Sequence, residues 1–271
     1  MSKVWFITGT SRGFGREFAL AALERGDQVA ATARDVSTLG DLVDRFGDAV
    51  LPLPLDVTDK AEVTSAVTQA HEQFGRLDVV VNNAGYGLFG MVEELSERQV
   101  RDQLETNFFG ALWVTQAVLP ILRAQGSGHI IQISTIGGVG AFPSLGGYHA
   151  SKWALEGLTE SLAQEVAGLG IKVTLVEPGG FATDWAGSSA SHATPIDVYQ
   201  PIRDAMAERS SGAQQGDPTA AGPALLQIVD AENPPLRVLF GSQPVDLVKH
   251  IYSQRLHTWD EWAHVSHAAQ G

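Results

Sequence analysis

The chain has 271 residues, of which 44% are hydrophobic and 18% are charged, a composition typical of a globular protein with a sizeable core. Its net charge of -13 at pH 7 repels phosphate backbones and argues against nucleic acid as a partner. The sequence has no cysteine and no apolar run long enough to cross a membrane, so we expect no disulfide, no thiol chemistry and no membrane insertion, and we expect a cytoplasmic protein without a leader segment.

Short apolar segments alternate with amphipathic segments along the chain. The apolar segments predict strands at residues 3–8, 28–33, 50–55, 77–83, 129–134, 171–178 and 236–241. The segments between them predict helices at residues 15–26, 37–47, 59–75 and 148–169, and one more within 217–235. Residues 97–125 predict either one long helix or two joined helices. Several strands are apolar on both faces, as strands are when helices cover both sides of a sheet. The pattern predicts an α/β fold: a doubly wound, Rossmann-like parallel sheet of about seven strands, with ligands at the strands' carboxyl ends.

No linker or internal repeat interrupts this alternation, so we expect residues 1–271 to form a single domain. The stretch after Thr183 is rich in Ala, Ser, Gly and Gln and contains no clear strand until residue 236. We expect residues 242–271 to be a C-terminal tail that holds a short amphipathic helix and ends in polar residues. The histidines of this tail are too loosely spaced to predict a metal site, and we expect none.

A glycine-rich loop, TGTSRGFG, joins the first strand to the first helix. Its glycines, Gly9, Gly13 and Gly15, allow a tight turn and a close approach of the backbone to a pyrophosphate. The helix start at Gly13, Phe14 and Gly15 offers N–H groups to phosphates, and Ser11 adds a hydroxyl. The loop therefore predicts a dinucleotide site, with a plain strand-to-helix turn as the alternative because the spacing is not the usual G-x-G-x-x-G.

The ends of the second and third strands bear on which dinucleotide fits. An acidic residue at the end of the second strand binds the ribose diol of NAD. Here Arg34 stands at that point, followed by Asp35, and Arg12 lies in the glycine loop. Two guanidinium groups suit a 2′-phosphate, so we predict NADP(H); the alternative is NAD(H), with Arg34 solvated and Asp35 on the diol. Asp56 is a candidate for the adenine amino group, unless it caps the next helix, a role for which Asp59 competes.

Further motifs follow in order along the chain. They are NNAG at 82–85, Asn107 in ETNFFG, Ser134 in QISTIGG, Tyr148 and Lys152 in YHASK, and PGGFAT at 178–183. Together with the glycine loop, these motifs resemble the short-chain dehydrogenase/reductase family, of its compact single-domain type, over roughly residues 4–184. The resemblance implies one dinucleotide-binding oxidoreductase domain, in which residues 184–235 form the substrate-pocket region.

The resemblance also implies roles for individual residues. On the adenine-ribose side of the cofactor it implies Asn83, Ala84 and Gly85. At the nicotinamide end it implies Pro178, Gly179 and Thr183. The implied catalytic set is Asn107, Ser134, Tyr148 and Lys152, of which Tyr148 and Lys152 also contact the cofactor.

Tyr148 and Lys152 stand four residues apart, so a helix places them on one face, one turn apart. An ammonium favours phenolate, so we predict that Lys152 lowers the pKa of Tyr148, which then serves as base toward an alcohol or acid toward a carbonyl. Lys152 would also hold the nicotinamide ribose hydroxyls. Ser134 would hydrogen-bond the substrate oxygen, and Asn107 would orient a water near Lys152. Each residue alone reads as structural; the combination favours catalysis.

Apolar residues after the strand ends predict a hydrophobic substrate pocket. The candidates are Leu88, Phe89, Phe142, Pro143, Phe181 and Trp185. We therefore predict an NADP(H)-dependent oxidoreductase that interconverts a secondary alcohol and a ketone or aldehyde by hydride transfer, with a hydrophobic small molecule as substrate. The alternatives are an NAD(H)-preferring enzyme of the same chemistry and a non-catalytic dinucleotide-sensing protein. The resemblance implies a homodimer or homotetramer.

Overall fold

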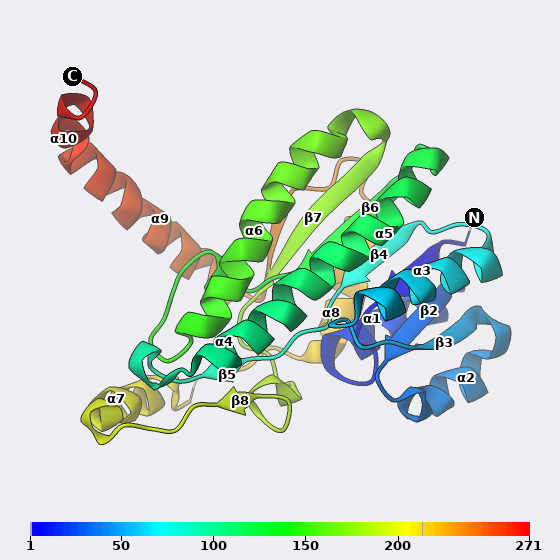
Figure 1. Ribbon diagram of the computed structural model, residues 1–271, viewed down its shortest axis with the longest axis horizontal. Coiled ribbons are helices and arrows are strands. Elements are labelled where there is room, and N and C mark those ends of the chain that lie inside the picture. Colours follow the sequence, from blue (N-terminus) through cyan, green and yellow to red (C-terminus); the bar gives the residue numbers. More distant parts are fainter. Residues whose placement is uncertain (1, 213) are drawn as a thin grey trace.

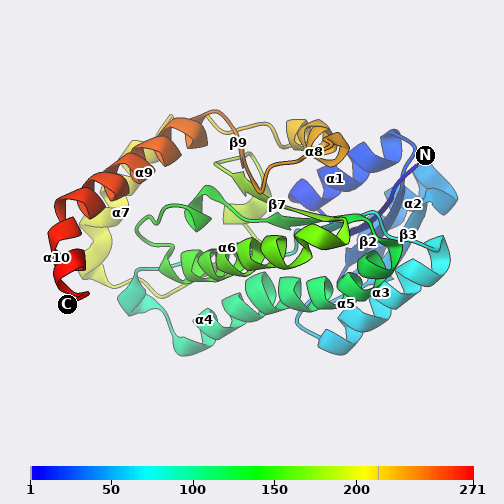
Figure 2. The same cartoon turned by 90° about the horizontal axis from the view of Figure 1, so that it is seen from above.

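The computed structural model describes residues 2–212 and 214–271 and shows, in this part of the chain, a seven-stranded parallel sheet between two layers of helices (Figures 1 and 2). The strands lie in the order β3-β2-β1-β4-β6-β7-β9. They are β1 (Val4–Ile7), β2 (Gln28–Ala33), β3 (Val50–Pro54), β4 (Val79–Asn82), β6 (Gly128–Ile133), β7 (Ile171–Pro178) and β9 (Arg237–Phe240). The predicted doubly wound α/β fold is confirmed.

The helices divide between the two faces of the sheet (Figure 2). One layer holds α1 (Gly13–Glu24), α2 (Gly40–Phe46) and α8 (Ala221–Asp230). The other holds α3 (Lys60–Phe74), α4 (Glu97–Leu104), α5 (Gly110–Gln125) and α6 (Gly146–Val166). Each layer encloses its own apolar core, one around Phe18 and Leu225 and the other around Val118 and Leu162. The strands contribute to both cores, which explains why they are apolar on both faces.

The sheet order creates a crevice near its middle. The chain runs from β1 outward to β3, returns, and then runs from β4 outward to β9 on the other side. Such a reversal opens a crevice at the carboxyl ends of the two central strands, β1 and β4. Strand β3 is an edge strand, and an edge tolerates Pro52 and Pro54 because those positions need no N–H donor on the open side.

Local side chains fix several helix boundaries. Asp59 caps α3 by accepting hydrogen bonds from the backbone N–H groups of Ala61 and Glu62. Gly75 ends the same helix in the left-handed conformation, at φ 76°. Asp217 accepts a hydrogen bond from Thr219 N at the turn that leads into α8.

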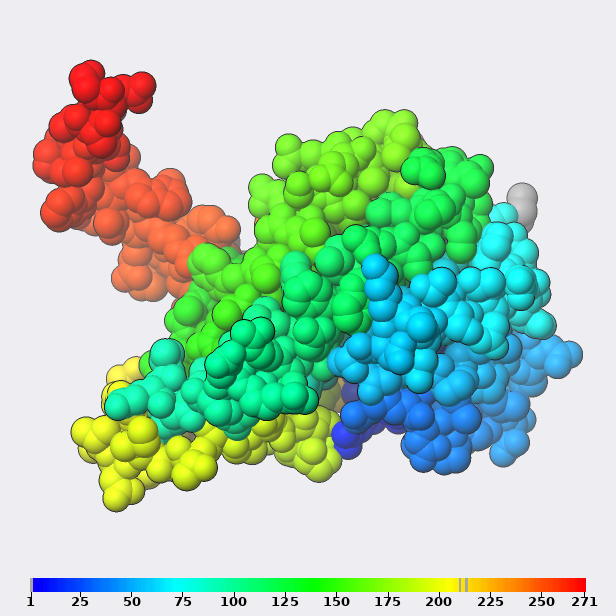
Figure 3. All heavy atoms as spheres, in the orientation of Figure 1, coloured from blue at the N-terminus to red at the C-terminus, as the bar shows by residue number. Residues whose placement is uncertain are grey.

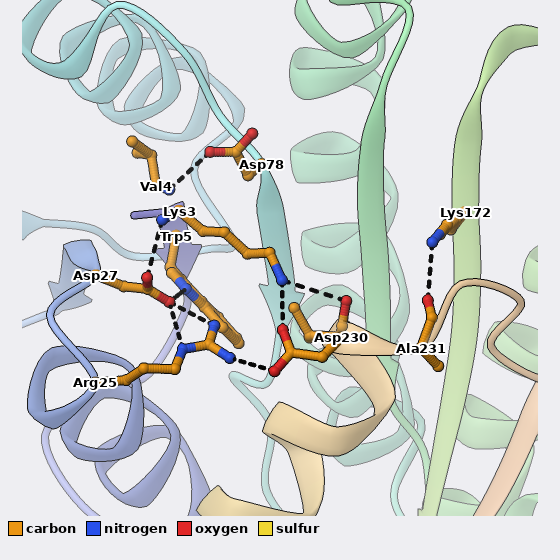
Figure 4. A network of polar contacts seen from close by, with 10 residues as sticks. Lys3, Val4, Trp5, Arg25, Asp27, Asp78, Lys172, Asp230 and Ala231 are labelled. Carbon is orange, nitrogen blue, oxygen red and sulfur yellow. Dashed lines mark hydrogen bonds and ion pairs between the residues drawn. The ribbon is translucent and has the colours of Figure 1, made fainter. Parts of the chain in front are cut away.

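Asp27 links several elements at the amino ends of the strands, opposite the crevice (Figure 4). This buried carboxylate accepts hydrogen bonds from Lys3 N at 2.9 Å and from the Trp5 indole N–H at 2.8 Å. It also pairs with Arg25, whose guanidinium reaches Asp230 at the end of α8 at 2.8 Å. Asp27 thus joins β1, the turn after α1 and α8.

The last third of the chain departs from the sequence expectations. Residues 184–235 contain a helix, α7 (Gln200–Ser210), and a short strand, β8 (Ser191–His192), which pairs in parallel with β5 (Leu88–Phe89). The expected short helix and polar tail were wrong in extent, because α9 (Gln243–Glu261) and α10 (Ala263–Ala268) make the segment almost entirely helical. This arm projects from the body and exposes Leu256, Trp259 and Trp262 (Figures 1 and 3).

None of the described helices combines the length and hydrophobicity needed to cross a bilayer. Within residues 2–212 and 214–271, no three His, Asp or Glu side chains gather as metal ligands. His257, in the arm, lies 3.3 Å from Glu261 of the same helix.

Candidate active site

A cavity of about 1120 Å³ lies at the carboxyl ends of the central strands. It begins at the loop after β1, passes the ends of β2 and β3, and continues past β4, β6 and β7. Residues from each of these ends line it, among them Gly9, Arg34, Asp56, Asn83 and Pro178. The cavity therefore occupies the crevice that the sheet order creates.

The glycine loop has the close-packed shape that its sequence predicted. Gly9 and Gly13 adopt positive φ angles of 70° and 59°, which favour glycine. A Cβ on Gly15 would lie 2.2 Å from Gly9 O, so α1 can approach the loop this closely only with glycine at that position. Gly9, Ser11, Arg12, Gly13 and Phe14 line the cavity, whereas Gly15 is buried beneath it.

The amino end of α1 opens toward this cavity with its donors free of a side-chain cap. The helix begins at Gly13, and Arg12 at the capping position makes no capping hydrogen bond. The first N–H groups of a helix carry a partial positive charge and need acceptors. An anionic pyrophosphate at the loop would supply them, so these residues fit a dinucleotide.

The two arginines expected near the cofactor ribose, Arg34 and Arg12, differ in their hydrogen bonds and ion pairs. Arg34 is exposed, lines the cavity and makes no hydrogen bond or ion pair in the part of the chain that the structure describes. Asp35 instead turns to its own backbone and accepts from Ser37 N at 2.9 Å. Arg12 pairs with Asp184 at 2.9 Å and with the Ser188 hydroxyl at 3.1 Å. A free guanidinium thus stands at the cavity wall while the neighbouring carboxylate is occupied.

Asp56 also lines the cavity, and the helix-cap alternative for it does not hold, because Asp59 caps α3. One Asp56 oxygen, Oδ1, accepts from the backbone N–H and the hydroxyl of Thr58, at 2.9 and 2.7 Å. The side chain is therefore fixed in position at the end of β3.

Asn83 fastens the glycine loop to the end of β4. Its side-chain amide donates to Thr8 O at 2.9 Å and to Gly9 O at 3.0 Å. The Thr8 hydroxyl in turn accepts from the backbone N–H groups of Asn83 and Ala84. Sequence reasoning missed Thr8, which lies at the end of β1 where its side chain can face the next strand. Asn83, Ala84 and Gly85 all line the cavity.

Tyr148 and Lys152 lie in the first turns of α6, both lining the cavity and both only 5% exposed. The Lys152 ammonium donates to Ile133 O at 2.7 Å and lies 6.0 Å from the centre of the Tyr148 ring. The predicted one-turn juxtaposition on a helix face is present.

Burial dominates the pKa values of this pair. It raises the pKa of Tyr148, and a hydrogen bond with the Thr135 side chain only partly opposes the shift. Burial also lowers the pKa of Lys152 to about 8, against the opposing charge of Glu156. The expected lowering of the Tyr148 pKa is therefore wrong for this structure, because burial is the largest influence on the phenol and raises its pKa. A protonated phenol favours the role of proton donor.

Ser134 and Thr135, neighbours at the end of β6, face different surroundings. The Ser134 hydroxyl is buried and lies beside Glu156 without a well-aligned hydrogen bond to it. The Thr135 hydroxyl instead lies beside Tyr148 and accepts from Gly137 N at 3.2 Å. Both residues line the cavity, but the Thr135 hydroxyl is the one placed with the phenol. The sequence alone does not distinguish Thr135 from Ser134, because either residue of the pair could end the strand.

Asn107 lies where the helix widens into π-helical turns, Glu105–Phe109, between α4 and α5. Its amide donates to Tyr86 O and to the Ser151 hydroxyl, both at 3.1 Å, and accepts from Tyr86 N. It does not line the cavity, but Gly85 has both the Asn107 amide and the Lys152 ammonium as its close neighbours. Asn107 thus holds the loop after β4 against α6.

Only half of the predicted substrate-pocket residues line the cavity. Phe142, Phe181 and Trp185 do, and the Trp185 ring lies 5.0 Å from that of Tyr148. Leu88 is buried in the core, Phe89 packs on Trp185 outside the cavity wall, and Pro143 is exposed away from it. The lining also includes Tyr86, Leu145 and His149, which the sequence did not single out, although Tyr86 directly follows NNAG. Pro178, Gly179 and Thr183 line it as expected.

Comparisons with known proteins agree with this geometry. The family model described as "short chain dehydrogenase" matches residues 3–194. The chain is 48% identical to Oxidoreductase BOA17 of Botryotinia fuckeliana over 250 residues, which cover 91% of each protein. It is 38% identical to 3-ketodihydrosphingosine reductase of Bacteroides thetaiotaomicron over 248 residues, which cover 88% of each.

Solved structures match over almost the whole chain. A short-chain dehydrogenase from Streptomyces avermitilis superimposes with a TM-score of 0.93 at 38% identity, covering 99% of this chain and 98% of that one. A short-chain dehydrogenase/reductase from Burkholderia phymatum in complex with NAD matches with a TM-score of 0.80 at 25% identity, covering 92% of each chain. A short-chain dehydrogenase from Burkholderia cenocepacia in complex with NADP matches with a TM-score of 0.76 at 25% identity, covering 96% and 97%.

Proposed function

Because the chain belongs to the short-chain dehydrogenase family, whose members are oxidoreductases that act on CH–OH groups, we propose that it is an NADP(H)-dependent enzyme that interconverts a secondary alcohol and a ketone or aldehyde. The observation that carries the proposal is the burial of Tyr148 and Lys152 side by side at the wall of the crevice cavity. The glycine loop, which fits a pyrophosphate, lines the same cavity.

The side chains at the crevice provide the proton chemistry. The bound nicotinamide would supply or accept the hydride. Tyr148, protonated in its buried site, donates its proton to the carbonyl oxygen in reduction and takes it back in oxidation. Lys152 stabilises the phenolate that remains, because its ammonium lies 6.0 Å from the ring centre. Developing charge on the substrate oxygen needs a second donor, which a hydroxyl beside Tyr148 can provide.

We assign that second donor to Thr135 in place of Ser134. Thr135 has its hydroxyl beside the phenol, whereas the Ser134 hydroxyl is buried beside Glu156. Asn107 acts as a positioning residue for the loop after β4, and the water that it was predicted to orient stays a prediction.

The preference for NADP(H) rests on Arg34. Its guanidinium is free at the cavity wall, and a planar donor fork matches phosphate oxygens. Asp35, the group that would select NAD(H), is held by Ser37. Solved relatives in complex with NAD and with NADP support a nicotinamide dinucleotide in general and leave the choice to these residues.

A hydrophobic substrate fits the apolar residues near Tyr148, above all Phe142, Phe181 and Trp185. The similarity to a reductase named for a 3-keto substrate supports a ketone. The direct test is a panel of carbonyls and alcohols, assayed with NADPH and NADH by absorbance of the reduced nicotinamide. Turnover of hydrophobic ketones with NADPH supports the proposal, and turnover only of small charged polyols contradicts its substrate class.

Self-association into a dimer or tetramer and a cytoplasmic location stay predictions. The exposed Leu256, Trp259 and Trp262 of the α9–α10 arm support self-association, because exposed apolar side chains of this kind are often covered in an assembly. Light scattering of the purified protein measures the oligomeric state directly.

A further inference from the structure

A cluster of three charged side chains, two of them buried, lies outside the cavity lining. Its members come from three elements: Glu156 from α6, Glu177 from β7 and Arg237 from β9. The side chains of Glu156 and Glu177 are 8% and 3% exposed, and that of Arg237 is 32% exposed. Neither buried carboxylate lines the cavity, and the reaction as described does not use them.

Arg237 joins the carboxylates of this cluster. Its Nε lies 3.2 Å from Glu156 Oε2 and 3.4 Å from Glu177 Oε1, and its outer nitrogen lies 2.9 Å from Glu160, an exposed residue one turn further along α6. One oxygen of each buried carboxylate, Glu156 Oε1 and Glu177 Oε1, has no hydrogen bond. One guanidinium therefore does not satisfy both buried acids.

The surroundings act differently on the pKa values of the two buried acids. Burial, together with the charge of Glu156, raises the pKa of Glu177 to about 8, so Glu177 is mainly protonated at pH 7. Burial also raises the pKa of Glu156, but Ser134, Arg237 and Lys152 all oppose that shift. Glu156 accepts a hydrogen bond from Arg237 and is the buried acid better stabilised as an anion.

Glu156 also lies on the same side of α6 as Lys152. The two residues stand four apart on α6, so they share a helix face, and Tyr148 stands four residues before Lys152 on that face. Among the described residues, Glu156 is the charged group that acts on the pKa of Lys152, and it opposes the loss of the lysine's proton. Around Lys152 the other groups are the Tyr148 phenol, Ile133 O and, beyond Gly85, the Asn107 amide.

Keeping a carboxylate in this position costs free energy, because a buried anion loses its hydration. Attraction between this anion and the buried Lys152 ammonium, which the site needs, would offset the cost. We propose that Glu156 is a positioning residue of the reaction, which keeps Lys152 in its ammonium form and thereby keeps a cation beside Tyr148. This inference rests on the proposed function of Tyr148 and Lys152.

The test compares Lys152 in three proteins. The chain has only five lysines, so their side chains can be followed individually by NMR titration of ¹³C-labelled protein without cofactor. Glu156→Gln removes the charge and keeps the shape, and we expect the pKa of Lys152 to fall by about one pH unit or more relative to the natural chain. Glu160→Gln is the matched control, since Glu160 also pairs with Arg237 but is exposed. We expect it to leave Lys152 unchanged.

A second readout is the pH profile of carbonyl reduction. If Lys152 loses its proton earlier, the alkaline limb of the kcat profile moves to lower pH in Glu156→Gln and not in Glu160→Gln. Glu156→Asp keeps the charge one methylene further away, so we expect a smaller shift, and this variant also serves if the Gln variant does not fold.

The outcomes separate the two proposals. An unchanged Lys152 titration in Glu156→Gln, or an equal shift in Glu160→Gln, overturns the role of Glu156 even if the enzyme reduces ketones. A lowered Lys152 pKa in a protein that reduces no carbonyl supports the role of Glu156 in setting the lysine's charge and overturns the proposed catalysis.

Discussion

The protein should become less stable as pH rises from acidic to alkaline values, and replacing Glu177 by Gln should make this decrease in stability much smaller. Glu177 is 3% exposed and has no hydrogen bond at Oε1, and burial is the main reason that its pKa rises from 4.5 to about 8. In the unfolded chain the carboxyl keeps its ordinary pKa. Its stabilising contribution is thus fully present below about pH 4.5 and is lost as pH rises through about 8.

The structure sets the size of the effect. One pKa unit is worth about 1.4 kcal/mol, so the whole shift corresponds to an upper limit of roughly 5 kcal/mol. The attraction of Arg237 is already contained in the pKa of about 8, and relaxation of the site around the ionised carboxylate reduces the figure further. We expect a difference of about 2 kcal/mol between acidic and alkaline pH.

The assay is urea unfolding followed by the fluorescence of the six tryptophans, at pH values from about 5 to about 8.5. The natural chain should lose stability over this range more steeply than Glu177→Gln. Glu160→Gln, which removes an exposed carboxylate from the same arginine, should behave as the natural chain does. Parallel pH dependences of the natural chain and Glu177→Gln would refute the reasoning, because Glu177 would then be ionised in the folded state at no cost.

Three further changes test other parts of the account. Arg34→Asp should weaken NADPH binding by about 10-fold or more, with little effect on NADH binding. Arg45→Asp, a control away from the cavity, should change the binding of neither cofactor. Fluorescence titration measures both affinities, and equal weakening of NADPH and NADH binding by Arg34→Asp would refute the role of Arg34. Thr135→Val should lower kcat by about 100-fold while Ser134→Ala lowers it far less, and the reverse order in steady-state kinetics would return the donor role to Ser134. Asp27→Ala should lower the free energy of unfolding by about 3 kcal/mol, because it leaves the buried Trp5 indole N–H without its hydrogen-bond acceptor. Cofactor affinity should not change, since Asp27 lies at the amino ends of the strands, away from the cavity. A thermal midpoint like that of the natural chain would contradict this.

The sequence was sufficient for the sheet and for the glycine loop, because both depend on strong local signals. Strands that are apolar on both faces predicted two helical layers, and Pro52 and Pro54 fall in the edge strand β3, where proline is tolerated. Gly15 could be placed beside a close-packed backbone because no other residue allows that approach.

Other features depend on tertiary packing that no local pattern encodes. Ser134 and Thr135 are adjacent hydroxyl residues, and only the surroundings of each side chain distinguish the one beside Tyr148. Glu156 has the sequence appearance of a surface residue on an amphipathic helix, but α6 turns it toward β7 and β9. The long α9 was underestimated because several of its apolar residues, among them Leu256 and Trp259, stay exposed instead of packing on the body.

The central claim is that the Tyr148 phenol transfers the proton in the reaction, and Tyr148→Phe tests it most directly. This variant loses one oxygen and keeps the ring that packs against Trp185. We predict that it binds NADPH as the natural chain does and reduces ketones at least about 100-fold more slowly at every pH. A variant that binds NADPH normally and still turns over ketones at the natural rate would contradict the account.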